Sequence, residues 1–271
     1  MGRLNKALER IKTREAENQA SYKGRNVAGT SSLISARQIN DPISADIRSV
    51  KLDKKHLTDH HVITDDIDPS VTTAYKMLRT RILQRMRANG WRSLAVTSAT
   101  QGDGKSLTSI NLAISLAGDV NHSVCLVDLD LRHSSVARYL GLKAKYGVSD
   151  CLATKVAPEE VFIRTDIERL VVAPNVHQVA LSSEMLSSPA MHELNEMLRS
   201  DPNRIVIFDL PPLLSADDAL AFEPLTDAIL LIVAEGITAR TDAMKALELL
   251  ENTNVLGTVL NRSDERTTAY Y

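Results

Sequence analysis

Three groups of residues in this sequence combine types and spacings that suit phosphate chemistry. The first is the stretch from Thr97 to Ser106, in which Gly102 and Gly104 precede Lys105 and Ser106. Glycines let the backbone turn its N–H groups toward a phosphate, a lysine ammonium can reach the outer phosphates, and a serine hydroxyl can bind Mg²⁺. We therefore interpret this stretch as a phosphate-binding loop. The alternative is an ordinary turn between a strand and a helix.

One position of this loop departs from the usual pattern G-x-x-x-x-G-K-[ST]. Ala99 stands where the first glycine is expected. Alanine fits a tight turn only when its φ angle stays negative, because its Cβ atom clashes with the backbone at most positive φ values. The sequence thus predicts a variant loop with ordinary backbone geometry at Ala99.

The second and third groups each follow an apolar run. The second is Asp128-Leu129-Asp130-Leu131-Arg132 and the third is Asp209-Leu210-Pro211-Pro212. Taken alone, the second could be a surface turn with a local ion pair, and the third an aspartate that caps the next turn. A nucleotide's Mg²⁺, however, needs oxygen ligands from neighbouring strand ends. Together the three groups predict a site for a nucleotide and its metal ion.

The elements that must position these groups alternate along the chain. We expect strands at 92–97, 123–128, 170–173, 204–208, 228–234 and 255–260, and helices at 70–89, 105–117, 134–140, 147–153, 189–199, 216–223 and 240–252, with Ser70 as the cap of the first helix. Apolar strands that alternate with amphipathic helices predict an α/β fold, with a mostly parallel sheet covered by helices on both faces. Ligands bind such sheets at the carboxyl ends of the strands, where the three groups lie.

The first 69 residues differ in character from the rest. Residues 3–19 have apolar side chains at helical spacing among basic ones, which predicts a short basic amphipathic helix. Residues 20–68 are rich in Ser, Thr, Asn and Asp, and we interpret them as a flexible linker in which the pair His60-His61 is solvated. The predicted organisation is 1–69 as helix and linker, 70–262 as the compact domain, and 263–271 as a tail.

Composition excludes several classes of function. The net charge is −2 and only 4% of the residues are aromatic, which argues against nucleic acid as a partner. Cys125 and Cys151 lack the spacing of metal ligands and suit a reducing compartment. No apolar run is long enough to span a membrane, so we expect a cytoplasmic protein without a membrane span of its own.

The three motifs resemble those of the bacterial tyrosine kinases, P-loop autokinases that regulate capsule and exopolysaccharide assembly. The family's loop begins with Ala or Gly, as residues 99–106 do, and its D-x-D-x-R and D-x-x-P motifs are matched by 128–132 and 209–212. The resemblance covers residues 70–271, with weaker similarities at 147–150, 186–188, 218–219 and 257–262. It implies a P-loop NTPase-type fold, ATP and Mg²⁺ as cofactors, and tyrosine as the acceptor. The N-terminal helix is most similar to the subgroup linked to exopolysaccharide and exosortase loci.

The resemblance also implies roles for single residues. The catalytic residues would be Lys105, Asp128, Asp130, Arg132 and Asp209, and the nucleotide would contact Gly102, Asp103, Gly104, Lys105, Ser106, Leu107 and Asn261. Lys105 would neutralise the β- and γ-phosphates, and Mg²⁺ would bind Ser106, Asp209 and Asp128. Asp130 could accept the proton of a tyrosine hydroxyl, but the sequence does not divide metal and base duties between Asp128 and Asp130. Arg132 would support charge or position the loop.

The chain ends on two adjacent tyrosines, Tyr270 and Tyr271, which we interpret as phosphoacceptors. Nine residues follow Arg262, and they reach at most about 30 Å, a length that suits insertion into a neighbouring subunit's site. Each phosphotyrosine adds about −1.5 to −2 charges, so two of them could expel the tail and weaken an oligomer.

Assembly is the point where the sequence departs from the family. Relatives form rings through an E-x-x-R-x-x-R pattern, and this chain has Thr73, Lys76 and Arg79 at those three positions. A homo-oligomer is still expected, but a ring, a dimer and an assembly that depends on an activator all stay open. The family's activator is usually a transmembrane polysaccharide chain-length (co-polymerase) protein, which we expect as the partner here.

Two other functions stay open. The first is a partition or positioning ATPase, a relative that switches between monomer and dimer with ATP. That class needs a second lysine near the start of the loop, where this chain has Thr100, and a terminal amphipathic helix, which does not follow Asn261. The second is a non-catalytic protein that senses ATP for a membrane-bound partner.

Overall fold

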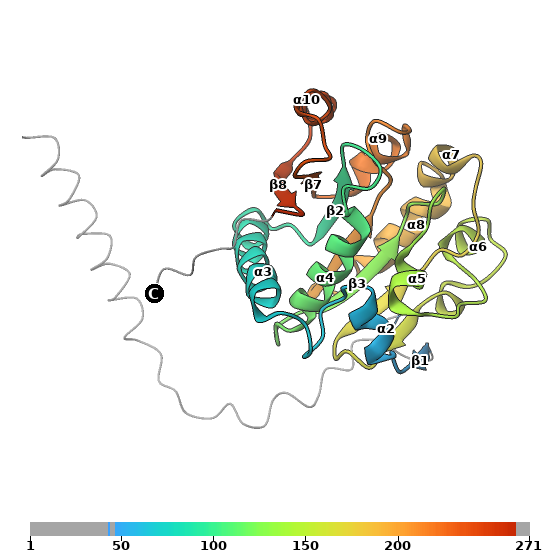
Figure 1. Ribbon diagram of the computed structural model, residues 1–271. Coiled ribbons are helices and arrows are strands. Elements are labelled where there is room, and N and C mark those ends of the chain that lie inside the picture. Colours follow the sequence, from blue (N-terminus) through green and yellow to red (C-terminus); the bar gives the residue numbers. More distant parts are fainter. Residues whose placement is uncertain (1–42, 44–46, 264–271) are drawn as a thin grey trace, which may run out of the picture. The chain divides into compact units, whose positions relative to one another are not determined.

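The computed structural model describes residue 43 and residues 47–263 of the 271-residue chain. The described residues form an eight-stranded sheet in the order β1-β4-β5-β3-β6-β2-β7-β8 (Figure 1). Its strands are β1 (Arg48–Val50), β2 (Ser93–Ser98), β3 (Ser123–Asp128), β4 (Ile163–Thr165), β5 (Leu170–Ala173), β6 (Arg204–Asp209), β7 (Ala228–Ala234) and β8 (Val255–Asn261). All neighbouring strands are parallel except β4 and β5, so the predicted mostly parallel sheet is confirmed.

Helices fill most of the connections between the strands (Figure 1). They are α2 (Lys54–Asp59), α3 (Pro69–Asn89), α4 (Lys105–Ala117), α5 (Val136–Leu140), α6 (Val148–Leu152), α7 (Ser182–Leu186), α8 (Pro189–Leu198), α9 (Asp218–Phe222) and α10 (Arg240–Leu249), with single 3₁₀ turns at Pro158–Glu160 and Glu223–Leu225. The expected helices at 70–89, 105–117, 134–140, 147–153, 189–199, 216–223 and 240–252 are all present within a few residues of their predicted bounds. Four short elements, α2, α7, β1 and β4, were not expected from the sequence.

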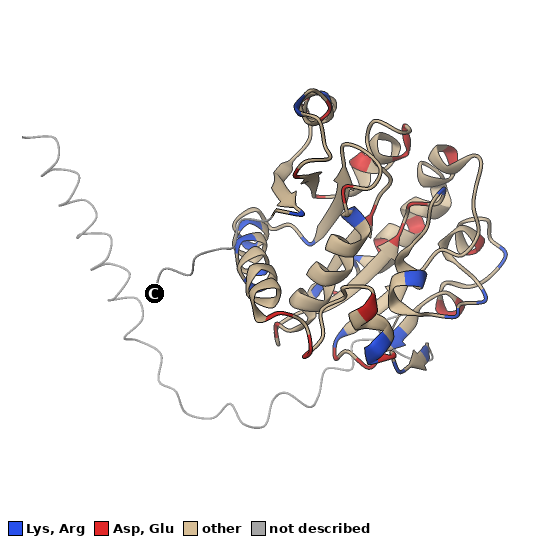
Figure 2. Cartoon of the chain, viewed as in Figure 1, with Lys and Arg blue, Asp and Glu red and all other residues tan. Residues whose placement is uncertain are grey.

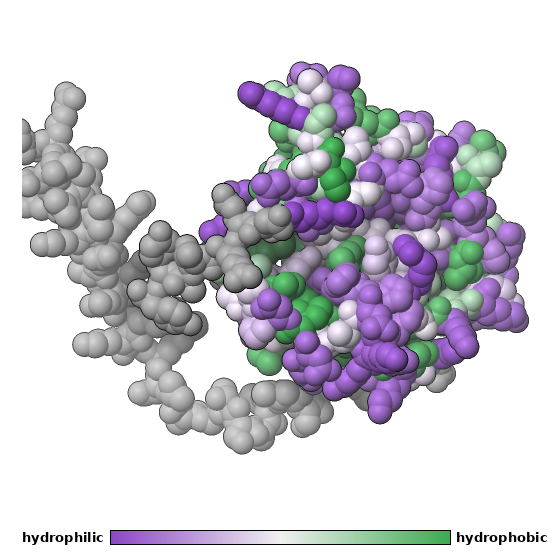
Figure 3. All heavy atoms as spheres, viewed as in Figure 1, coloured by the Kyte–Doolittle hydropathy of each residue, from purple (hydrophilic) through white to green (hydrophobic). Residues whose placement is uncertain are grey.

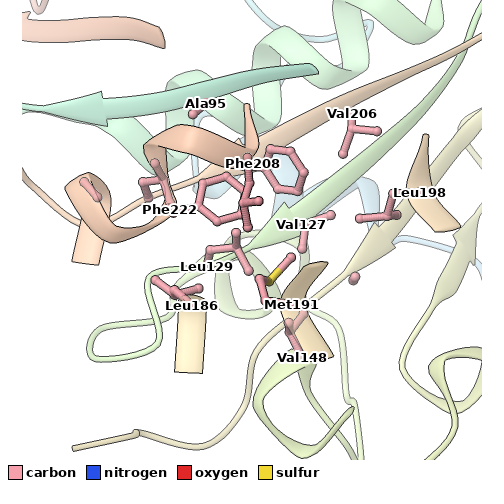
Figure 4. Close-up of a cluster of buried hydrophobic side chains, with 14 of the residues drawn as sticks. Ala95, Val127, Leu129, Val148, Leu186, Met191, Leu198, Val206, Phe208 and Phe222 are labelled. Atoms are coloured by element: carbon pink, nitrogen blue, oxygen red, sulfur yellow. The ribbon is translucent and has the colours of Figure 1, made fainter. Parts of the chain in front are cut away.

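The core has two halves, one on each face of the sheet, because successive side chains of a strand point to opposite faces. In β3, Val124 and Leu126 join the cluster beneath α2 to α5, whereas Cys125 and Val127 join the cluster beneath α6 to α10. Figure 4 shows part of the second cluster, in which Phe208 and Phe222 meet edge to face with their ring centroids 4.7 Å apart. Helices therefore cover both faces, as the continuous apolar runs of the strands predict.

The N-terminal boundary of the domain is a correction to the predicted linker of residues 20–68. β1 pairs with β4, and Leu52, Leu57 and Val62 are buried in the core. Asp53 caps α2 by accepting hydrogen bonds from two backbone N–H groups of that helix. A strand of three residues and a helix of six are too short to show a hydrophobic period, so the folded domain begins at or before Ile47 and not at Ser70.

Two details of the same region also differ from expectation. Asp68, and not Ser70, caps α3, because Pro69 occupies the first helical position and the Asp68 carboxylate accepts the Ser70 N–H. His60 is not simply solvated, since its ring stacks on that of His56 with centroids 4.1 Å apart. The predicted helix of residues 3–19 and the two terminal tyrosines lie outside the described residues.

Charge and hydrophobicity are unevenly spread over the surface. α3 carries five basic residues and no acidic one, and Figure 2 shows the ribbon of this helix with several blue segments. On the face drawn in Figure 3, hydrophobic residues form small groups within a mostly hydrophilic surface. Among the described residues, no helix combines the length and the apolar character needed to cross a membrane.

Candidate active site

The phosphate-binding loop connects β2 to α4 at the carboxyl end of the sheet. Gly102 and Gly104 have φ angles of 89° and 92°, in the region that glycine adopts without strain. Ala99 is fully buried and is not among the residues with positive φ, so the predicted ordinary geometry at this position is confirmed. α4 begins at Lys105, which places the backbone N–H groups of its first turn beside the loop.

Asp103 braces the loop from within. Its carboxylate is fully buried and accepts hydrogen bonds from the Thr100 N–H at 2.9 Å and from the Thr238 hydroxyl at 2.7 Å. Thr238 follows β7, so the bond ties the loop to a distant part of the chain. Sequence reasoning missed Thr238, which no motif marks.

Lys105 lies at the centre of the predicted residues. Its Nζ atom is 2.7 Å from Asp130 Oδ2, 3.7 Å from Asp209 Oδ2 and 3.1 Å from Ser106 Oγ. Only 10% of its side chain is exposed. The structure therefore brings the loop and the ends of β3 and β6 into one site, with Asp128 paired to Asp209 across the two strands.

Among the described residues, only one of the two carboxylate oxygens of Asp209 accepts a hydrogen bond. Ser109 donates its hydroxyl hydrogen to Asp209 Oδ1 at 3.1 Å, whereas the buried Oδ2 atom accepts no hydrogen bond from the described residues. Ser109 was missed by sequence reasoning, although it lies four residues after Lys105 and hence on the same face of α4. An oxygen that is paired with Lys105 at 3.7 Å but accepts no hydrogen bond points to a ligand that completes the site.

The second motif folds back on its own backbone. Asp128 is fully buried, and its Oδ2 atom accepts the N–H groups of Ser135 and Val136 at 3.1 and 3.0 Å. Asp130 accepts the His133 N–H at 2.9 Å through Oδ1, which leaves Oδ2 for Lys105. Both carboxylates are thus oriented by the segment that leads into α5.

Arg132 points away from this cluster. Its Nε–H group contacts the buried Asp218 carboxylate at 3.1 Å and the Ser182 hydroxyl at 2.8 Å. The side chain is 39% exposed and still lines the cavity over the loop. These contacts tie the end of the second motif to Ser182 in α7 and Asp218 in α9.

The electrostatics of the cluster are unbalanced. Burial, followed by the nearby Asp209 carboxylate, raises the pKa of Asp128 well above its usual value, and burial likewise raises the pKa of Asp209. Burial alone would lower the pKa of Lys105, but Asp209 and Asp130 outweigh that effect and raise it. With one lysine among three aspartates, the ionised cluster carries two unbalanced negative charges.

A magnesium ion fits this donor set. Mg²⁺ prefers carboxylate and hydroxyl oxygens, carries the missing charge, and binds through one or two carboxylates together with water and substrate phosphates. Asp209 Oδ2 and the Ser106 hydroxyl are the available oxygens. Within the described part of the chain, no three His, Cys, Asp or Glu side chains converge on a metal position.

The end of β8 closes the loop from the other side. Asn261 donates its side-chain N–H to the Asp103 carbonyl oxygen at 2.8 Å, and its amide would collide with any Cβ atom at Gly104. Arg262 has a φ angle of 58° and donates to the Gly102 carbonyl oxygen at 2.9 Å. Sequence reasoning gave a role to Asn261 but none to Arg262, although the weaker similarity at 257–262 includes both residues.

A cavity of about 560 Å³ lies over these groups. The residues that line it come from the phosphate loop and the start of α4, from the segment 130–139, from Pro211 to Ala216, and from two further positions, 178 and 262: Gln101, Gly102, Gly104, Lys105, Ser106, Leu107, Asp130, Arg132, His133, Ser134, Ser135, Arg138, Tyr139, Gln178, Pro211, Pro212, Ser215, Ala216 and Arg262. Its volume is in the range of small-molecule and cofactor sites. A larger groove of about 720 Å³ between α2, α3 and α4 contains none of the predicted site residues.

Comparison with known proteins agrees with this geometry. Residues 91–268 match the ParA family, described as "NUBPL iron-transfer P-loop NTPase". The tyrosine-protein kinase YwqD of Bacillus subtilis (strain 168) is 31% identical over 189 residues, 69% of this chain and 79% of YwqD. The succinoglycan biosynthesis transport protein ExoP of Rhizobium meliloti (strain 1021) is 33% identical over 186 residues, 67% of this chain. The kinase domain of the Escherichia coli tyrosine kinase ETK is 26% identical with a TM-score of 0.67, covering 74% of this chain and 78% of that domain.

The extent of these matches differs. The chain spans most of YwqD but only 23% of ExoP, so ExoP contains much that has no counterpart here. The matched part includes the phosphate loop and the ends of β3 and β6, which together form the site. A P-loop NTPase domain of this type binds nucleotide through that loop. The chain belongs to the ParA family of P-loop NTPases and, within it, to the bacterial tyrosine-protein kinases.

Proposed function

We propose that this protein is an ATP- and Mg²⁺-dependent protein-tyrosine autokinase that acts in exopolysaccharide or capsule assembly. Its acceptors would be Tyr270 and Tyr271. The observation that carries the proposal is the meeting of Lys105 with Asp130 and Asp209 beneath a cavity large enough for a nucleotide. A loop lysine for phosphates and a separate carboxylate at the cavity wall are the parts that phosphoryl transfer to a hydroxyl requires.

The chain's residues would divide the reaction as follows. Lys105 leaves Asp130 for the β- and γ-phosphates and stabilises charge on them, which frees Asp130 Oδ2 to accept the tyrosine proton. The phenolic oxygen forms a bond to the γ-phosphorus, and the bond to the bridging oxygen breaks with its electron pair remaining on ADP. A carboxylate is a weak base for a phenol of pKa about 10, which suits a loose transition state that asks little of the nucleophile.

Ser106 and Asp209 would hold the metal ion, with Ser109 orienting Asp209. Asp128 would contribute through Oδ1, which accepts a 3.3 Å hydrogen bond from the Asp130 N–H, since its Oδ2 atom accepts two N–H groups at the start of α5. Bound Mg²⁺ supplies neutralisation of phosphate charge. Gly102 to Leu107 would surround the phosphates through backbone N–H groups, and Asn261 would lie near the adenine ring.

The cellular role of the proposal depends on a partner. ExoP is named for succinoglycan biosynthesis and transport, and we extend that setting to this chain. It would act at the inner face of the membrane through a transmembrane chain-length protein, as a homo-oligomer. The basic α3, which carries Thr73, Lys76 and Arg79 in the positions of the ring pattern, leaves a ring and a dimer both open.

Phosphotyrosine mass spectrometry tests the proposal. The protein is purified from its own cells beside Lys105→Met and a variant with Tyr270 and Tyr271 both changed to Phe. Phosphate on Tyr270 or Tyr271 is expected, with a loss of about 100-fold or more in Lys105→Met. An unmodified tail, with ATP, Mg²⁺ and the partner's cytoplasmic segment supplied, would overturn the autokinase.

The match to the ParA family favours one second candidate, a nucleotide-switch ATPase. The same incubation separates the functions: this candidate releases phosphate from ATP without forming phosphotyrosine. A non-catalytic ATP sensor would bind ATP and do neither.

A further inference from the structure

The short helix α2 packs directly against α5, near the C-terminal end of α5 (Figure 1). His56 Nε2 lies 2.8 Å from the Arg138 carbonyl oxygen, in the last turn of α5. His60 stacks on His56, and its ring meets the Tyr139 ring edge to face with centroids 6.1 Å apart. His56 of α2 and His60, the residue that caps the C-terminus of α2, therefore contact the same turn of α5.

The fit between these two helices is close. Gly141 ends α5 with a φ angle of 65°, and a Cβ atom there would lie 3.0 Å from the His56 ring. Below the histidines, Leu57 and Val62 belong to the same buried cluster as Val136 and Leu140. α2 is thus packed into the core of the domain.

The other end of α5 holds the acidic motif. The N–H groups of Ser135 and Val136 bind Asp128 Oδ2, and the His133 N–H binds Asp130 Oδ1. Arg138 and Tyr139 also line the cavity. A helix of five residues has little stability of its own, so its placement depends on the elements packed around it.

We propose that His56 is a positioning residue for phosphoryl transfer: by holding the Arg138 carbonyl, it holds α5 and, through α5, the carboxylates of Asp128 and Asp130. This role rests on the proposed kinase function. The proposal means that residues 53–62 influence catalysis, although they lie outside the residues 91–268 that match the family. His56 itself touches neither the cavity nor the predicted catalytic residues.

The chemistry of the contact suggests its own rescue variant. A carbonyl oxygen only accepts hydrogen bonds, so His56 must carry a hydrogen on Nε2. Glutamine has an N–H donor at a similar distance from its Cα atom and no ring, whereas alanine has no donor. His56→Gln should therefore keep the contact that His56→Ala removes. Lys55→Ala, a change at an exposed position of the same helix, is the matched control.

The experiment compares the full-length protein and these three variants in ATP affinity, in the rate of phosphotyrosine formation at saturating ATP, and in thermal unfolding. His56→Ala should lose about 10-fold in rate, the size typical of changes to residues that orient a metal or catalytic ligand. Its ATP affinity should stay within about twofold, because the phosphate loop is untouched. His56→Gln should recover most of the rate, and Lys55→Ala should match the unaltered protein.

Three results would overturn the proposal: an unchanged rate in His56→Ala, equal losses in His56→Ala and His56→Gln, or a loss of ATP affinity as large as the loss of rate. Thermal unfolding shows whether a variant is simply damaged. If the unaltered protein forms no phosphotyrosine, the proposal of an autokinase fails, and the same variants are then compared by phosphate release from ATP. The rate of phosphate release then decides the role of His56 by the same three criteria.

Discussion

At the scale of single residues, the buried carboxylates of the site lower the stability of the folded state. Asp128 and Asp209 are fully buried and have raised pKa values, so at neutral pH the folded state must hold charges that it disfavours. The ion pairs of Lys105 offset part of this cost. Sites that must bind a cation commonly keep such strain, because the free energy is recovered when the ligand arrives.

Changing Asp209 to Asn should therefore stabilise the nucleotide-free protein while lowering phosphoryl transfer by about 100-fold or more. A raised folded-state pKa means that the folded protein holds its proton more tightly than the unfolded chain. Stability is thus lost as pH rises above the unfolded value of about 4, and the advantage of Asp209→Asn should appear above that pH and vanish below it. Urea unfolding at several pH values measures this.

Asp227 provides the opposite control. Burial acts to raise its pKa, but hydrogen bonds from the Arg92 N–H, the Arg199 side chain and the Ser93 N–H lower it overall. The stability that it contributes is present above pH 4 and is lost as pH falls, so Asp227→Asn should destabilise the protein at neutral pH. If both variants shift the urea midpoint in the same direction, the electrostatic account of the site is wrong.

At the scale of elements, the phosphate loop is shaped as much by β7 and β8 as by its own glycines. Thr238 after β7 and Asn261 at the end of β8 both bind Asp103, and Arg262 binds Gly102. These contacts explain why the loop needs glycine at position 104 for two reasons, positive φ and the nearness of Asn261. The loop and the last two strands therefore act as one unit.

Alanine substitutions at two glycines distinguish the effect of positive φ from the effect of the contact with Asn261. Gly104→Ala should lower ATP affinity at least about 10-fold, because the new methyl group meets Asn261 and displaces the loop. Gly236→Ala adds a methyl group at a similar φ of 71° but in open space, so it should cost only about 1–2 kcal/mol in stability and leave ATP binding unchanged. Nucleotide titration and urea unfolding check both. Equal effects on ATP affinity would show that backbone strain alone matters.

At the scale of the whole molecule, the folded unit is larger than the part that carries the motifs. β1 adds a strand at one edge of the sheet, and Leu52, Leu57 and Val62 fill the core beneath α4 and α5. Asn111 of α4 fixes the same segment by accepting the Ile63 N–H at 2.9 Å and donating to the His61 carbonyl oxygen at 3.1 Å. Residues 47–63 are therefore an integral part of the folded domain.

A chain shortened to residues 70–271 should accordingly be much less stable than one of residues 40–271. Loss of the three buried side chains removes roughly 5 kcal/mol, which is comparable to the whole stability of many domains. Thermal and urea unfolding of the two chains, followed by circular dichroism, measure the difference. A 70–271 chain that unfolds with the same midpoint would show that the segment only rests on the core.

By itself, the sequence determined the fold class and the location of the site. The apolar runs at β2, β3 and β6 and the polar residues that end them are local patterns, and the parallel sheet brings such strand ends to one edge. Lys105, Asp130 and Asp209 could therefore be placed together before any distance was known. The loop could likewise be interpreted as a variant with Ala99 at its first position, because that interpretation also depends on local sequence.

The tertiary structure alone decided which residues support the site. Asp209 is oriented by Ser109, Arg132 turns to Asp218, and α2 packs on α5, and each of these contacts joins residues on different elements. Short elements such as β1 and α2 leave no periodic signal, because their burial is provided by distant parts of the chain. Local pattern sets the chemistry, whereas long-range packing sets its geometry.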